Sequence, residues 1–176
     1  MALTAIPGAG AKLRGSTLAA LFNERLPLTA YKTADESVTS SAVSQDDDAL
    51  SLAVVANAVY LVTAWMIYEA TTASDIRWGF TWPTGATMPW GEMALDTAAA
   101  GIFGDVKPNA FGAPASGDVF QAGGAGAGSQ LTGILYGLLT TSSTAGTLQL
   151  QWAQGTSGAT ATKVKAGSVL EARRLA

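Results

Sequence analysis

The amino-acid sequence predicts an all-β fold: an antiparallel, jelly-roll-like β-sandwich preceded by a short N-terminal helical arm. Segments of alternating apolar and polar residues follow Glu36, and turn residues separate them at regular intervals, as in sandwiches and barrels. No helical pattern lies between the strands, as a parallel sheet would require. Eight or nine strands can be distinguished, which is typical of a jelly roll. A chain of 176 residues can form one such domain with an appendage.

The N-terminal segment up to Pro27 has a helical pattern instead. Ser16 can cap a helix over residues 16–26, and Pro27 stops it. Four apolar residues recur at helical spacing and form the candidate assembly interface: Leu18, Leu21, Phe22 and Leu26. Because so short a helix is marginal in water, its apolar side needs a partner surface. The helix either folds back on its own domain or, as we expect, belongs to an arm of residues 1–33 that docks on another subunit, leaving residues 34–176 as the sandwich domain.

The β-sandwich domain divides into short strands joined by turns. The expected strands are Ser37–Ser44, Leu50–Val55, Val59–Tyr68, Ile76–Trp82, a short one at Val119 and Phe120, Leu131–Thr141, Thr147–Ala153, Thr160–Lys165 and Ser168–Leu175. The second and third of these are nearly continuous apolar runs, which indicates central strands, with Asn57 and Ala58 as their turn. Asp46, Asp47 and Asp48 are expected to form the preceding turn.

Two segments do not have a clear strand pattern. Thr84–Ala94 is interrupted by Pro89, so we expect it to be irregular or to lie at a sheet edge. The segment from Asp96 to Gly128 is rich in Gly and Ala and predicts a long loop that carries function or lies on a neighbour.

Aromatic residues mark one face of the segment Ile76–Trp82. Every second residue is large and apolar, which places Trp78, Phe80 and Trp82 on the same side of a strand. We expect Trp78 and Phe80 in the core. Trp82, beside Pro83, and Trp90 are candidates for a ligand or subunit contact.

Composition argues against an enzyme. The chain has no His and no Cys, so it lacks the residues of the usual nucleophilic triads and most ligands of zinc sites. Carboxylates such as Glu69, Asp75, Glu92 and Asp96 are the candidates for a glycosidase pair, but every protein of this size has such carboxylates. We therefore predict a non-enzymatic protein without a cofactor.

The remaining site motifs are weak. Gly10 and Gly15 precede Ser16 but lack the Lys of a phosphate-binding loop, and the glycines of 123–128 lack dinucleotide-binding spacing. Three consecutive aspartates at 46–48 favour a solvated turn over a calcium site, since neighbouring strand residues point to opposite sides. No metal site is predicted.

Charge and hydropathy exclude two classes of partner. Charged residues make up only 13% of the chain, the net charge is −3, and the ten Lys and Arg residues are scattered, so no basic surface for nucleic acid is expected. The apolar run Ala49–Tyr68 is as long as a membrane span, but Asn57 interrupts it and acidic residues flank it. We interpret it as two strands and expect no membrane insertion. The first ten residues lack a secretory signal pattern, so synthesis in the cytoplasm is expected.

Five segments together resemble one known protein family: Lys12–Arg14, Tyr31–Ser41, Gln45–Asp48, Gly123–Gly128 and Ser143–Gln154. The chain is similar in these to small virion structural proteins encoded by tailed bacteriophages of actinobacteria and related prophages. The resemblance covers the chain from Lys12 onward and departs most in Asp96–Gly117. It implies a minor tail or otherwise structural protein, a jelly-roll module that forms trimers, and no catalytic residues.

These observations give one leading functional hypothesis and one alternative. We expect a surface protein of a phage virion, made in the host cytoplasm and held on the major capsid or tail proteins by its N-terminal arm, as a capsid decoration or a minor tail component. The alternative is a tail fibre or baseplate module that binds a receptor or a host-surface glycan. That module would expose one or more of Trp82, Trp90 and Trp152 in a groove.

Overall fold

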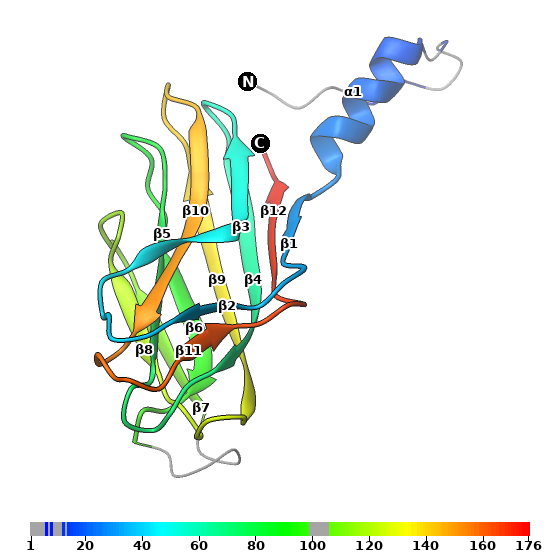
Figure 1. The fold of residues 1–176 in the computed structure, drawn as a ribbon. Helices are drawn as coiled ribbons and strands as arrows, with labels where there is room; N and C mark the ends of the chain where they lie inside the picture. The colour runs from blue at the N-terminus through cyan, green and yellow to red at the C-terminus, as the bar shows by residue number, and fades with distance from the viewer. Residues whose placement is uncertain (1–5, 7, 9–11, 13, 99–105) are drawn as a thin grey trace.

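A computed structural model of the chain describes residues 6, 8, 12, 14–98 and 106–176. Within these residues it contains one helix and twelve strands (Figure 1). The elements are α1 Gly15–Arg25, β1 Leu28–Tyr31, β2 Glu36–Val38, β3 Gln45–Val54, β4 Val59–Glu69, β5 Ile76–Thr81, β6 Trp90–Leu95, β7 Val106–Phe111, β8 Val119–Ala122, β9 Gln130–Thr140, β10 Gly146–Gln154, β11 Thr162–Val164 and β12 Val169–Arg174. The all-β prediction is confirmed.

Eight of the strands pair as a folded hairpin that closes into a jelly roll. Antiparallel pairs join β1 to β12, β3 to β10, β4 to β9 and β5 to β8. Among these eight strands the first therefore pairs with the last, the second with the second-to-last, and so on inward. The two resulting sheets have the orders β1-β12-β4-β9 and β3-β10-β5-β8. This nesting of pairs is the arrangement of a double-sheet jelly roll.

A hairpin inserted between β5 and β8 widens the first sheet. Strand β6 pairs with β9, and β7 pairs with β6 at the edge. The prediction that Thr84–Ala94 is irregular or at an edge is therefore wrong from Trp90 onward, because β6 lies between two strands. Strand β7 falls within the predicted loop after Asp96. Its Pro108 fits a strand at the sheet edge, where a missing N–H breaks no essential pairing.

Two further details of the sequence prediction are corrected at the second sheet. Asp46, Asp47 and Asp48 lie inside β3 rather than in a turn, and β3 is an edge strand that pairs with β10. The predicted strand Ser37–Ser44 is shortened to β2, which ends at Val38 and pairs with β11.

The core lies between the two sheets. Its largest fully buried side chains include Trp78, Trp152, Tyr68 and Phe80. The ring of Tyr68 meets that of Trp78 edge-on at a centroid distance of 5.0 Å. Trp78 and Phe80 are in the core as predicted. The first-sheet strands β4 and β9 bury every second residue and expose the others, so their apolar runs are not buried on both faces.

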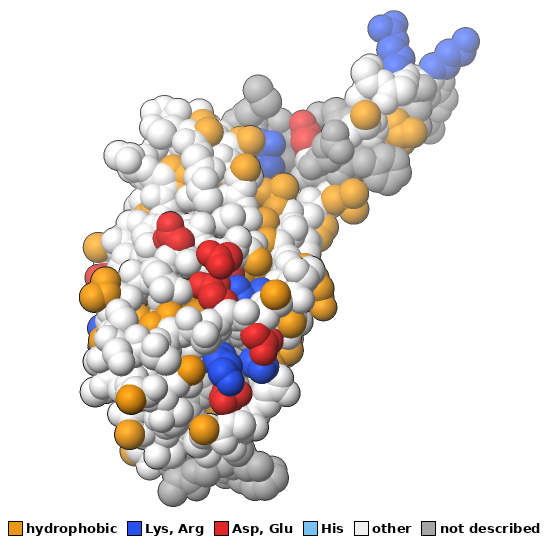
Figure 2. Space-filling view, viewed as in Figure 1, with side chains coloured by type: hydrophobic (Ala, Val, Ile, Leu, Met, Phe, Trp, Pro, Cys, Tyr) orange, Lys and Arg blue, Asp and Glu red, His pale blue; other side chains and the backbone are white. Residues whose placement is uncertain are grey.

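The helix α1 stands beyond the end of the sandwich in Figure 1, joined to it by β1. Pro27 separates the two elements, because proline cannot continue a helix. Residues 28–31, which the sequence places in the arm, pair with β12 as β1 and are part of the sheet. In Figure 2 the visible face of the sandwich is largely uncharged, with acidic and basic side chains gathered near its middle.

Candidate assembly interface

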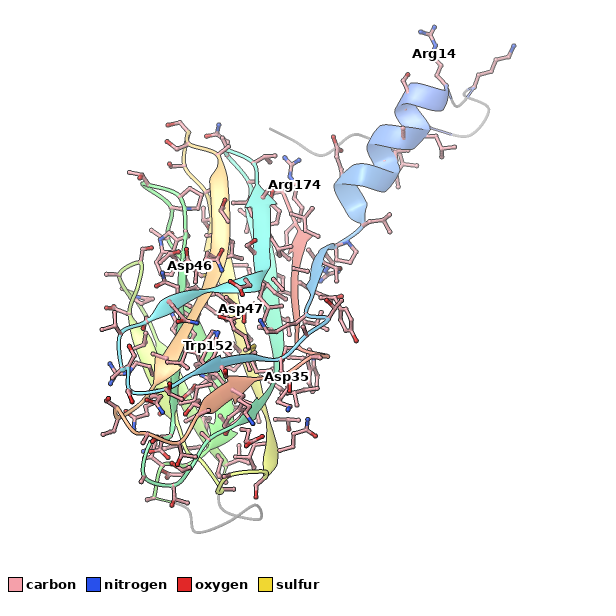
Figure 3. The ribbon with its side chains drawn as sticks, in the orientation of Figure 1. Arg14, Asp35, Asp46, Asp47, Trp152 and Arg174 are labelled. Atoms are coloured by element: carbon pink, nitrogen blue, oxygen red, sulfur yellow. The ribbon has the colours of Figure 1, made fainter. Side chains whose placement is uncertain are left out.

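The helix α1 presents part of its apolar side to solvent. Leu18 is 43% exposed and Leu26, just after the helix, is 59% exposed, while Leu21 is half-buried. The side chain of Phe22 lies outside the described residues. Figure 3 shows Arg14 at the helix end that is farthest from the sandwich. At least two of the four predicted interface residues are thus not covered by their own domain.

The C-terminal end of the helix borders a shallow hollow on the sandwich. The hollow has a volume of about 210 Å³ and is lined by residues of the arm, β1, the β3–β4 turn region and β12: Glu24, Leu26, Leu28, Ala53, Val55, Tyr60 and Arg174. Most of these side chains are apolar. The joint between arm and sandwich therefore leaves an apolar recess next to the exposed Leu26.

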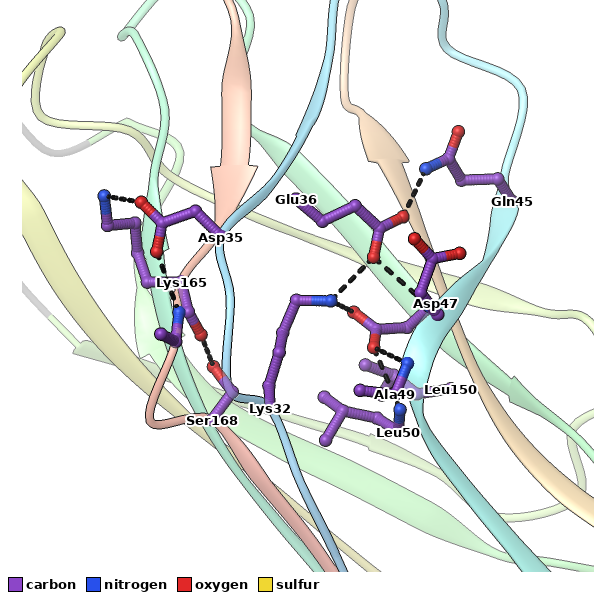
Figure 4. A network of polar contacts seen from close by, with 12 residues as sticks. Lys32, Asp35, Glu36, Gln45, Asp47, Ala49, Leu50, Leu150, Lys165 and Ser168 are labelled. Carbon is purple, nitrogen blue, oxygen red and sulfur yellow. Dashed lines mark hydrogen bonds and ion pairs between the residues drawn. The ribbon is translucent and has the colours of Figure 1, made fainter.

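A buried ion network fixes the chain just after β1 (Figure 4). The Lys32 ammonium donates to Glu36 Oε2 at 2.6 Å and to Asp47 Oδ2 at 2.9 Å. The other oxygen of Asp47 accepts the backbone N–H groups of Ala49 and Leu50, both at 2.9 Å. Lys32 and Asp47 are buried, and a buried charge is tolerated only when it is paired in this way.

The same network shifts the proton affinity of its lysine. Burial alone would lower the pKa of Lys32, but the hydrogen bonds to Glu36 and Asp47 outweigh it and raise the pKa above 10.5. The ammonium therefore stays charged at neutral pH. Because Lys32 follows β1 and Asp47 lies in β3, their pairing joins the base of the arm to the second sheet.

A second, exposed ion pair lies nearby. Lys165 donates to Asp35, whose other oxygen accepts the backbone N–H of Ala166 at 2.9 Å. This hydrogen bonding lowers the pKa of Asp35 and raises that of Lys165. The loop between β1 and β2 is therefore attached to the β11–β12 turn as well as to β3.

The structure does not expose the two predicted contact tryptophans. Trp90 is only 3% exposed and its ring lies edge-on to those of Phe80, at 5.3 Å, and Phe120, at 4.8 Å. Trp90 therefore offers no exposed ring for the predicted ligand or subunit contact, because its ring packs between the sheets. Trp82 is half-buried and donates its indole N–H to the carbonyl of Ala86 at 3.0 Å. Trp152 is fully buried, so no aromatic groove for a glycan forms from these residues.

The candidate catalytic carboxylates have structural partners instead. Buried Glu92 accepts hydrogen bonds from the indole N–H of Trp78 and from the Asn109 amide. Burial raises the pKa of Glu92, although both hydrogen bonds lower it. The carboxylate thus connects the core to the edge strand β7.

Two other carboxylates hold the glycine-rich segment 123–128. Asp75 accepts the N–H of Gly124 at 2.8 Å, and Glu69 accepts the N–H of Gly128 at 2.7 Å. The latter bond, with the charge of Lys163, lowers the pKa of Glu69. Through these contacts Asp75 and Glu69 hold the loop 123–128 in place.

Neither a metal site nor a membrane-spanning helix is found in the part of the chain that the structure describes. No group of three or more Asp or Glu residues there converges as a metal site would require. The helix that is described there is too short and too polar to cross a bilayer.

No protein-family model and no curated protein matches the chain. Among solved structures, the chain is similar to a chain in the structure of infectious bursal disease virus Gt strain, with 10% identity and a TM-score of 0.22. The match covers 88% of this chain and 38% of that chain. The infectious bursal disease virus VP2 subviral particle gives 10% identity and a TM-score of 0.20 over 86% and 37%. The chain spans little more than a third of the chains it matches, and a likeness at these TM-scores carries no argument about function.

Sequence reasoning missed the ion network at the base of the arm. The resemblance includes Tyr31–Ser41 and Gln45–Asp48, which contain Lys32, Glu36 and Asp47, but the pairing is visible only once β3 is placed beside β1. A lone Lys in the otherwise uncharged stretch 26–34, followed by acidic residues, was the available signal.

Proposed function

We propose that this chain is a non-enzymatic structural protein of a bacteriophage virion, displayed on the particle and attached through its N-terminal arm. The observation that carries the proposal is the placement of α1. Its Leu18 is exposed, and so is Leu26 just after it, while the rest of the chain closes a jelly roll without the helix. An apolar helix side left in water needs a partner surface to be stable.

Three further features support this role. The resemblance to virion proteins of actinobacterial tailed phages extends over the chain from Lys12 onward. The low charge of 13% suits a subunit whose surface is covered by neighbours. The ion network of Lys32 fixes the base of the arm on the sandwich, so a force applied to the helix reaches the whole domain.

The decisive experiment deletes residues 1–26 in the phage or prophage that encodes the chain. We expect the truncated protein to keep its β-type circular dichroism and cooperative unfolding, because β1 and all later strands remain. We expect it to be absent from purified particles by mass spectrometry. The variant Leu18→Ser/Leu26→Ser should give the same loss, and Val43→Ser, at an exposed apolar residue in the sandwich, should be incorporated normally.

Two results would contradict the proposal. A truncated chain that does not fold would show that the helix belongs to the core of its own domain. A truncated chain that folds and enters particles at the normal level would show that attachment uses another surface.

Copy number separates the two positions on the particle that we propose. A capsid decoration would be present in hundreds of copies per particle, and a minor tail component in a handful. Quantitative mass spectrometry of intact virions measures this directly, and a particle without the protein would remove both.

A further inference from the structure

The two sheets have outer faces of opposite character. On the second sheet, the outward residues of β10 and β5 are polar, with Gln149, Gln151 and Thr81 among them. On the first sheet, exposed Leu61 and Trp65 of β4 lie beside Ile134 and Leu138 of β9. Both faces border solvent in the single chain. An exposed apolar face, such as that of the first sheet, indicates a missing partner.

The apolar residues of the first sheet form one continuous surface, which we name the outer apolar face. It runs from β4 across β9 and β6 to β7, and its members are Leu61, Trp65, Met93, Val106, Pro108, Tyr136 and Leu138. The six other than Pro108 are each 40–59% exposed. Trp, Tyr and Met are enriched at the cores of protein interfaces, and Lys, Glu and Asp are depleted there.

A hollow opens at the Leu61 and Leu138 end of this face. Its volume is about 330 Å³, and it is lined by Leu61, Pro89, Trp90, Ala110, Tyr136, Gly137 and Leu138. The ring of Tyr136 lies over Gly91, where an added Cβ would come within 2.9 Å of its hydroxyl. The face thus has fixed relief that a complementary surface can fill.

The size of the outer apolar face approaches one half of an ordinary dimer contact. Four neighbouring strands at about 4.8 Å spacing, over seven residues at about 3.3 Å each, give a flat footprint on the order of 450 Å². Side-chain relief raises the accessible area toward the about 800 Å² that each partner contributes to a standard interface.

The charges beside this face select a second copy as the partner. Strand β12 borders β4 and carries Glu171 and Arg173 on the same outward side, opposite Thr63 and Leu61 respectively. Consider a two-fold axis that lies between the two facing sheets, runs perpendicular to their strands and passes over Ala172 of β12 and the β4 residue paired with it. Such an axis places Glu171 of each copy against Arg173 of the other, as an isologous contact requires.

The same axis also brings two residues of the outer apolar face into contact. Tyr136 of β9 lies at the same level along the strands as Glu171 of β12, and Leu138 lies at the level of Arg173. The axis therefore sets the Tyr136 ring of each copy on Leu138 of the other, next to the hollow. A partner of strong opposite charge is not favoured, because this border of the face carries one charge of each sign.

We propose that the outer apolar face binds the same face of a second copy of this chain, sheet against sheet about this two-fold axis. The pairing goes beyond attachment through the arm and does not depend on it. It also differs from the three-fold association that the sequence resemblance implies, so the number of chains in solution is informative.

The first test reverses the two charges in the full-length chain. Glu171→Arg alone and Arg173→Glu alone each set like charges against each other on both sides of the axis, and each should weaken the dimer at least about fivefold in analytical ultracentrifugation. An equimolar mixture of the two variants should form a mixed dimer with near wild-type affinity. Only pairing between copies of this chain predicts that restoration.

The second test removes the apolar contact. Trp65→Ser should raise the dimer dissociation constant by at least about tenfold, whereas Val43→Ser, at an exposed residue outside the face, should leave it unchanged. Leu18→Ser in the helix should also leave it unchanged. That result separates this contact from the arm, so failure of one proposal is distinguishable from failure of the other.

Three outcomes would overturn the pairing. A wild-type chain that stays monomeric up to about 100 µM would show that the face takes another partner, since interfaces of this size usually bind more tightly. A trimer, or a dimer that Leu18→Ser abolishes and Trp65→Ser does not, would show that copies associate through other surfaces.

Discussion

Lys32 is the residue that joins the arm to the sandwich. It is buried between Glu36 and Asp47, and both carboxylates also accept hydrogen bonds from other groups. A buried ion pair adds little net stability when compared with apolar residues, but removing one partner leaves an uncompensated charge. The network therefore specifies where the chain leaves β1 more than it adds to total stability.

Replacement of Lys32 should show this dependence. Lys32→Met leaves the Asp47 carboxylate buried without its cation, and we expect the free energy of unfolding to fall by about 3 kcal/mol. The double variant Lys32→Met/Asp47→Asn should recover about 1–2 kcal/mol of that loss, because the amide oxygen can still accept from Ala49 and Leu50. Urea unfolding of the wild type, both single variants and the double variant measures the coupling, and simple additivity would contradict it.

Glu92 should make stability depend on pH. Burial raises its pKa above the ordinary value of 4.5, so the folded state binds this proton more tightly than the unfolded state does. The proton on Glu92 therefore stabilises the folded state fully below pH 4.5, and this stabilisation is lost as the pH rises through the raised pKa.

Glu92→Gln should remove that loss. Relative to wild type, the variant should gain stability between pH 4 and 7 by on the order of 1 kcal/mol, on top of a constant cost for one lost hydrogen bond from Trp78 or Asn109. Urea titrations across this range measure the difference. Parallel profiles for Glu92→Gln and wild type would refute the role of burial.

At the scale of elements, segments in which apolar and polar residues alternate regularly were predicted well as strands, and segments without this alternation were predicted poorly. Ile76–Trp82 and Thr147–Ala153 alternate clearly, and the strands β5 and β10 follow them closely. Strand β7 was not predicted, because its Val106, Pro108 and Ala110 face outward and read as loop residues. Its pairing with β6 is a contact across the insertion that single-strand patterns do not contain.

The burial of Trp90 could not be predicted for the same reason. Whether an aromatic residue near a proline lies inside or outside depends on which face of β6 meets the second sheet. That choice is set by β9, where Gly137 leaves room for Trp90: an added Cβ there would lie 2.8 Å from the Trp90 Cβ. Glycine spacing in β9 was thus the signal for close packing.

Gly133 of β9 provides a direct test of this packing. An added Cβ would lie 2.7 Å from the Trp78 ring, which is fully buried and cannot move away. Gly133→Ala should therefore lower the free energy of unfolding by about 1–3 kcal/mol, as overpacked cores do. Gly112→Ala, where nothing lies within 4 Å, is the matched control and should stay within about 0.5 kcal/mol of wild type. Equal effects in thermal unfolding would contradict the close contact.

At the scale of the whole molecule, three surfaces have three different characters. The second sheet exposes polar side chains, the first sheet exposes the outer apolar face, and α1 exposes leucines beyond the end of the sandwich. The jelly roll and the helix followed from sequence periodicity. The outer apolar face did not, because an apolar run such as Val59–Tyr68 reads as a core strand until alternate residues are found outside.

Pairing of two copies should make thermal stability depend on protein concentration. If folded dimers unfold to separate chains, each tenfold rise in concentration adds about 1.4 kcal/mol per dimer. With the unfolding entropy usual for chains of this length, the midpoint should rise by roughly 2 °C for each tenfold increase. Calorimetry of the full-length chain from about 2 to 200 µM, a range over which such interfaces assemble, measures the slope. Trp65→Ser should lower the slope and Val43→Ser should keep it, since only Trp65 lies on the outer apolar face. A midpoint independent of concentration in the wild type would mean that the jelly roll unfolds as a monomer and that this face has no second copy on it.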